Sequence, residues 1–175
     1  MTIRSCALPA NAFLRRHDHA GGYTDCFVAK ASGRISLSRY VEVFYTTGLF
    51  KAERAILSLA GQPSSDSQAR EVAAGTALTF AAWRVEDRAE DQLLLCDITG
   101  RTRSWFMVAP APDEATDKTL LYFGSAITAV PQGATGRITI GPLYRSLTGL
   151  HILYSRALLA AAKRRMARLD QAVKP

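Results

Sequence analysis

The segment that decides the fold runs from Pro142 to Ala172 and has the sequence PLYRSLTGLHILYSRALLAAAKRRMARLDQA. Apolar residues recur in it at steps of three and four, the spacing of one face of an α-helix. They are Leu143, Leu147, Leu150, Tyr154, Leu158 and Ala161. Pro142 suits the first turn, where its missing N–H is not needed. A helix of this length spans ~45 Å, so we expect it to pack along a broad sheet.

The chain before this helix supplies strands for such a sheet. Its β-rich segments are separated by short polar turns, which favours an antiparallel meander. The predicted strands are Tyr23 to Lys30, Thr76 to Glu86, Gln92 to Asp97, Arg101 to Ala109 and Thr119 to Val130.

Two short helices are expected between the first strand and the meander. Ser36 or Ser38 can cap the first of them, and Gly61 suits the C-terminal end of the second. A bend at Gly48 separates the two, and one helix kinked there is the alternative. The order of elements predicts an α+β fold in which a curved antiparallel sheet wraps around the long C-terminal helix. Residues 1–22 are expected to be an irregular arm, and residues 23–175 a single domain.

Composition excludes several classes of protein. The chain has 175 residues and a net charge of +7, but its cations are scattered or gathered at the end of the last helix. No basic stripe alternates with aromatic residues, so we expect no nucleic-acid partner. No segment is long and apolar enough to span a membrane, and the first residues lack the features of a signal peptide. Three widely spaced cysteines indicate free thiols in a reducing compartment, and therefore a cytoplasmic protein.

Three short strings resemble known sequences. They are GTALTFAAWRVE at 75–86, SWF at 104–106 together with TLLYFGSA at 119–126, and HILYSR at 151–156. These strings and the order of elements are similar to a small bacterial family of unknown function within the START-like, or SRPBCC, helix-grip superfamily. The resemblance implies a sheet that encloses a hydrophobic cavity against the long helix. Some members follow an NAD-binding domain, which this chain lacks, so we expect no cofactor.

Glu53 is the first candidate for a polar group in that cavity. It lies in helical phase with Leu49, Ile56 and Ala60, so a carboxylate interrupts an otherwise apolar row. A carboxylate that faces a core needs a partner or a shifted pKa. Arg84 or His151 could be that partner. The alternative is a surface pair with Lys51 or Arg54.

Alternation along the predicted strands supplies further candidates. The segment from Thr102 to Val108 carries its less charged side chains at even positions, so we expect Ser104 and Phe106 to face inward and Trp105 to face outward. Together with the polar candidates, the expected ligand-binding residues are Glu53, Arg84, Ser104, Phe106, Phe123, His151 and Tyr154.

These residues predict a binder of a small apolar or amphipathic molecule. An enzyme of the same fold, with acid–base chemistry on an apolar substrate, is one alternative. A domain with a filled interior that binds another protein is the other. His17 and His19 fit an exposed arm better than a metal site, because no further ligands stand at a suitable spacing.

Overall fold

A computed structural model gives the fold of residues 3–19, 22–112, 117–128, 130–132, 137–139 and 142–172. Of residues 130–132, 137–139, 142–148, 150, 170 and 172 it describes the backbone alone. The predicted helix-face residues Leu143, Leu147 and Leu150 therefore lie outside the described side chains.

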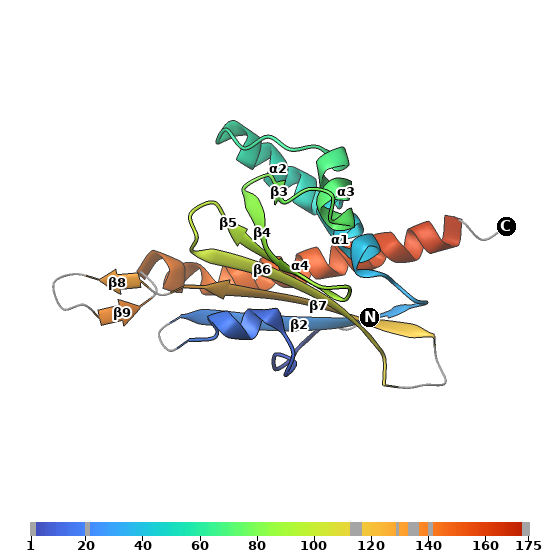
Figure 1. The fold of residues 1–175 in the computed structure, drawn as a ribbon, viewed down its shortest axis with the longest axis horizontal. Helices are drawn as coiled ribbons and strands as arrows, with labels where there is room; N and C mark the ends of the chain where they lie inside the picture. Colours follow the sequence, from blue (N-terminus) through green and yellow to red (C-terminus); the bar gives the residue numbers. More distant parts are fainter. Residues whose placement is uncertain are drawn as a thin grey trace.

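The fold is α+β, as predicted, with a long C-terminal helix packed against one antiparallel sheet (Figure 1). The strands of this sheet are β1 (Arg4–Ser5), β2 (Tyr23–Ser32), β3 (Thr79–Phe80), β4 (Trp83–Arg88), β5 (Gln92–Asp97), β6 (Thr102–Pro110) and β7 (Lys118–Ile127). Their order is β1-β2-β7-β6-β5-β4-β3. The meander from β3 to β7 thus ends beside β2, with which β7 pairs from Tyr23↔Ile127 to Ser32↔Lys118.

The helices lie between and after these strands. They are η1 (Phe13–His17), α1 (Leu37–Tyr45), α2 (Gly48–Leu59), α3 (Asp66–Ala74) and α4 (Pro142–Ala172). A separate hairpin of β8 (Val130–Gln132) and β9 (Arg137–Thr139) precedes α4.

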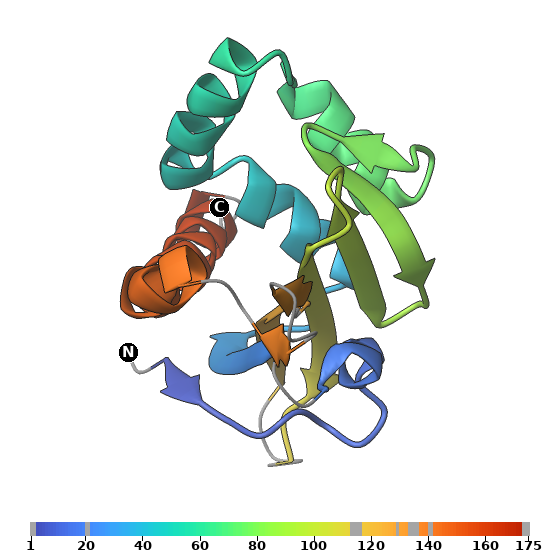
Figure 2. The same ribbon diagram turned by 90° about the vertical axis from the view of Figure 1, so that its left-hand side faces the viewer.

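The long helix α4 lies on the same side of the sheet as α1 (Figure 2). Leu158, predicted to face the sheet, is only 4% exposed. Leu159, Ala162 and Met166 are also buried in the same core. The buried stripe is wider than predicted, because α1 covers one flank of α4 and the sheet covers another.

The two faces of the sheet bury different clusters. Phe27, Leu95, Phe106 and Phe123 belong to the inner cluster beneath α1 and α4. Trp105 belongs to an outer cluster. The predicted alternation along β6 is therefore correct.

The N-terminal arm covers the outer face. Leu14 of η1 is fully buried beside Trp105. The side chain of Gln92 fixes the arm, because its Oε1 accepts hydrogen bonds from the Phe13 N–H and the Trp105 indole. Residues 3–19 of the arm thus cover the sheet, and His17, predicted to be exposed, is half-buried and contacts Glu86 at 2.6 Å.

Side-chain caps define the helices between β2 and β3. Ser36 caps α1, and Thr47 caps α2 directly before Gly48, so the predicted helix pair is confirmed. Ser65 opens α3 with a capping box, and Gly75 ends it in the left-handed conformation.

The predicted strand from Thr76 to Glu86 is wrong as a single element. The chain reverses at Ala81, whose φ is +50°, and the segment becomes the short hairpin of β3 and β4. A non-glycine residue seldom adopts this conformation, so the sequence gives no sign of the turn.

Candidate functional site

A cavity of about 180 Å³ lies between the inner face of the sheet and helices α1, α2 and α4. One part of its wall is apolar and mostly aromatic, and the rest carries hydroxyl, carboxyl and imidazole groups. The apolar residues are Phe44, Tyr45, Phe50, Trp83, Phe123 and Leu158. The polar residues are Glu53, Thr102, Ser104, Ser125, His151, Tyr154 and Ser155.

Helix α4 contributes His151, Tyr154, Ser155 and Leu158 to the wall. Residues at these spacings of three, four and seven lie on one face of a helix. Polar residues stand among the apolar ones in the middle of α4 because this face of the helix borders the cavity.

Glu53 enters the cavity from α2, where it accepts a hydrogen bond from the Tyr154 hydroxyl. Burial raises the pKa of the Glu53 carboxyl, and the Tyr154 hydrogen bond opposes this only in part. Burial, together with the same carboxyl, raises the pKa of Tyr154. The pair therefore binds a proton more firmly than the isolated groups would.

The partner of Glu53 differs from every predicted one. Lys51 and Arg54 both pair with Asp66, each at 2.6 Å, and leave Glu53 to Tyr154. The predicted apolar row on α2 is also wrong, because Ile56 is 69% exposed while Phe50 is buried. Helix α2 has apolar residues on two faces, and the aromatic core receives the face that carries Phe50.

A second carboxyl, that of Asp25, lies behind His151. The Asp25 side chain is 8% exposed, and its Oδ2 lies 3.6 Å from His151 Nε2. Tyr23 donates to the same oxygen at 3.0 Å, and the Ser125 N–H donates to Oδ1 at 2.8 Å. Burial raises the pKa of Asp25, while His151 and these hydrogen bonds act in the opposite direction.

Three cavity residues carry a buried polar atom without a hydrogen-bond partner in the described part of the chain. These atoms are the Tyr45 hydroxyl, Ser125 Oγ and His151 Nε2, the last of which faces Asp25 Oδ2 at 3.6 Å. An unmade hydrogen bond at a buried hydroxyl costs about 1–3 kcal/mol, and native proteins leave few such groups. Each of these groups therefore has a hydrogen-bonding capacity that the described residues do not use.

The structure brings together five of the seven predicted ligand-binding residues. Glu53, Ser104, Phe123, His151 and Tyr154 all line the cavity. Two do not reach it. The side chain of Arg84 is exposed and lies beside Cys96, with which it pairs across β4 and β5. Phe106 faces inward as predicted, but it packs against Phe44 and Phe123 within the solid core.

Sequence reasoning missed Tyr45, Asp25 and Ser125. The alternation of β2 placed Asp25 on the same face as the core residue Phe27. A carboxylate on that face was a signal, of the kind that singled out Glu53. Tyr45 and Ser125 carried no such signal.

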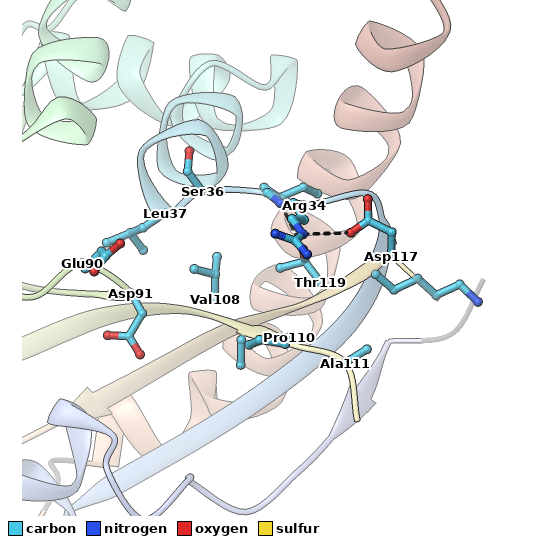
Figure 3. Close-up of a pocket in the computed structure, with 13 residues that line it drawn as sticks. Arg34, Ser36, Leu37, Glu90, Asp91, Val108, Pro110, Ala111, Asp117 and Thr119 are labelled. Carbon is cyan, nitrogen blue, oxygen red and sulfur yellow. Dashed lines mark hydrogen bonds and ion pairs between the residues drawn. The ribbon is translucent and has the colours of Figure 1, made fainter. Parts of the chain in front are cut away.

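A larger groove lies at the other end of the sheet (Figure 3). It is open to solvent, and its volume is about 1200 Å³. Its best-defined polar contact is the pair Arg34–Asp117, whose side chains are both largely exposed. Unlike the cavity, this groove has no buried polar atom that lacks a partner among the described residues.

The described residues give little support to other types of site. Among them there is no cluster of three or more metal-ligating side chains. No helix described here has the length and apolar composition to cross a membrane. In the basic end of α4, Arg165 donates to the carbonyl oxygen of Thr46, so this cation has a structural role.

Comparison of the chain with models of protein families and with curated proteins gave no match. Its function must therefore be inferred from the geometry of the cavity.

Proposed function

We propose that this protein binds one small, mostly apolar molecule, with one or two hydrogen-bonding groups, in the cavity beneath α4. The observation that carries the proposal is a group of buried polar atoms without a hydrogen-bond partner among the described residues, above all the Tyr45 hydroxyl, in a wall that combines aromatic side chains with several polar groups. Ligand sites in proteins have this composition, apolar with a few convergent polar groups.

The size of the cavity sets the size of the ligand. Its volume of about 180 Å³ slightly exceeds an engineered cavity of ~150 Å³ that holds benzene. Pockets for drug-sized ligands begin at ~300 Å³. The expected ligand is therefore a single ring with one or two substituents, or an aliphatic molecule of the same volume.

The charges of the wall favour a ligand without negative charge. No lysine or arginine is among the described residues that line the cavity. Glu53 lines it and Asp25 lies behind it, and burial already raises the pKa of both carboxyls. An anionic ligand would add a like charge to this desolvated environment.

The resemblance to the START-like superfamily supports the same proposal. Membership would explain why a cavity lies between a sheet and a long helix, and we propose it on the order of elements and the strings quoted above. A cytoplasmic location in a bacterium is part of this proposal, and the free cysteines support the reducing compartment.

Thermal unfolding with phenol, acetophenone and benzoate tests the proposal. A ligand at 100 times its Kd stabilises the folded state by ~2.7 kcal/mol, which should raise Tm by about 5–10 °C. We expect shifts with phenol and acetophenone, and a much smaller one with benzoate. Ser104→Leu, which adds a side chain toward the cavity, should abolish the shift while circular dichroism shows an intact fold. Equal shifts in this variant would contradict binding in the cavity.

An enzyme with acid–base chemistry is the second candidate, favoured by the Glu53–Tyr154 pair. A buried carboxyl with a raised pKa is suited to proton transfer near neutral pH. In that case a bound compound would be recovered chemically changed. Glu53→Gln would stop the conversion but keep the affinity within about threefold, less than one hydrogen bond contributes. Recovery of the compound unchanged would favour the binding protein.

A further inference from the structure

The two cysteines at the edge of the sheet lie unusually close to each other. Cys6 Sγ is 3.2 Å from Cys26 Sγ. Both are free thiols. They are twenty residues apart along the chain, so they are brought together by the fold and not by closeness in the sequence.

Strand pairing explains this position. β1 pairs with β2 in the register Arg4↔Val28 and Ser5↔Phe27, which places Cys6 opposite Cys26. The Cys6 N–H donates to the Cys26 carbonyl at 3.0 Å, so the pairing continues to this point. Opposite residues of antiparallel strands have Cα atoms ~4.5–5.5 Å apart, within the ~4.4–6.8 Å that a disulfide spans. The sulfur atoms need to approach by only about 1 Å to bond.

The two thiols also differ in the way that a redox pair requires. Cys6 is half-buried, whereas Cys26 is only 3% exposed. The contact with Cys26, with a smaller contribution from Arg4, lowers the pKa of Cys6 against the effect of burial, while the same contact and burial raise the pKa of Cys26. An accessible thiol with a lowered pKa beside a second thiol is the usual arrangement in redox-sensing proteins.

We propose that Cys6 and Cys26 form a reversible redox site, at which a peroxide oxidises Cys6 and Cys26 then closes a disulfide. In the first step the Cys6 thiolate attacks one peroxide oxygen. The S–O bond forms, the O–O bond breaks, and the other oxygen takes up a proton and leaves as water. Cys6 becomes a sulfenic acid and the peroxide is reduced.

In the second step the Cys26 sulfur attacks the Cys6 sulfur. The S–S bond forms, the S–O bond breaks, and the hydroxyl group leaves as water with the Cys26 proton. In total, two thiols and one hydrogen peroxide give one disulfide and two molecules of water. A thiol reductant reverses the reaction by exchange.

The disulfide would fasten the N-terminal arm to the sheet. The chain between the two cysteines contains η1, whose Leu14 is buried in the outer cluster with Cys26 and Trp105. Closure of this loop restricts the unfolded chain and should raise Tm by about 5–10 °C. This redox site is separate from the cavity and does not depend on the proposed ligand.

The test is to treat the reduced protein with hydrogen peroxide, alkylate the remaining thiols and map the products by mass spectrometry. We expect a Cys6–Cys26 peptide lighter by two hydrogen atoms, formed at least about tenfold faster than any oxidation of Cys96, and removed by dithiothreitol. Thermal unfolding of the same samples should show the rise in Tm for the wild type and for the control Cys96→Ser, but not for Cys6→Ser.

A second measurement uses the wild-type protein and so does not depend on the folding of any variant. Dimedone added with the peroxide should trap the sulfenic acid on Cys6 and reduce the yield of disulfide. Alkylation of both Cys6 and Cys26 after peroxide treatment would overturn the proposal. Oxidation of Cys96 before this pair, or a disulfide only between two molecules, would also overturn it.

Discussion

Tyr45→Phe should leave the ligand-free protein at least as stable as the wild type. The ring of Tyr45 is fully buried and packs against Phe50, Phe80 and Phe106, and phenylalanine preserves all of these contacts. The hydroxyl that is removed has no partner among the described residues. Because burying such a group costs about 1–3 kcal/mol, its loss should change the free energy of unfolding by between about 0 and +1 kcal/mol.

Tyr40→Phe is the matched control. Tyr40 is equally buried in the same helix, but its hydroxyl donates to the Tyr122 carbonyl at 3.1 Å. The loss of this hydrogen bond should cost about 0.5–1.5 kcal/mol. The two variants should therefore differ in Tm by about 1–10 °C, with Tyr45→Phe the more stable.

Urea unfolding followed by circular dichroism measures both stabilities, and titration with phenol measures the affinities. Tyr45→Phe should bind phenol about 3–10-fold more weakly, the value of one hydrogen bond. Tyr40→Phe should bind it within about twofold of the wild type, because Tyr40 does not line the cavity. The reasoning fails if Tyr45→Phe loses as much stability as Tyr40→Phe, since the Tyr45 hydroxyl would then be satisfied inside the protein.

Three further substitutions, two of them with a matched control, test the fold and the site. Leu158→Ala should cost about 2–5 kcal/mol in urea unfolding, whereas Leu153→Ala on the same helix, 65% exposed, should stay within about 0.5 kcal/mol; equal losses would mean that α4 is oriented differently. Folding raises the pKa of Glu53, so its stabilisation is present below about pH 4 and is lost as the pH rises through the folded pKa. The stability of Glu53→Gln relative to wild type should therefore increase between about pH 4 and 7, and a decrease would refute the raised pKa. Gly124→Ala should destabilise by more than about 1 kcal/mol, since a Cβ there would lie 2.8 Å from the Asp25 carbonyl oxygen, while Gly149→Ala, in open space on α4, should stabilise by about 0.5–1 kcal/mol; the reverse order would contradict the packing of β7.

The parts of the fold that sequence predicted are those with strong local periodicity. The strands β5, β6 and β7 are β-rich segments between polar turns, and α4 carries a long apolar stripe, so type and order followed from pattern alone. The prediction of which face of β6 points inward was correct because the charged residue Arg103 lies on the opposite face.

The parts that sequence did not predict depend on tertiary contacts. Helix α2 offers apolar residues on two faces, and only the position of the aromatic core decides that Phe50 is buried and Ile56 exposed. The arm at residues 3–19 has no period, yet Gln92 and Trp105 on distant strands hold it in place. The partner of Glu53 is Tyr154 of α4, which packs on α2 although the two residues are 101 positions apart in the sequence.

A crystal structure of the protein soaked with phenol tests the central claim most directly. We predict electron density for one ring between Phe44, Trp83 and Phe123, with the phenol oxygen within hydrogen-bond distance of the Tyr45 hydroxyl or His151 Nε2. Side chains that close the cavity, or ordered water alone in it while phenol binds elsewhere, would contradict the claim.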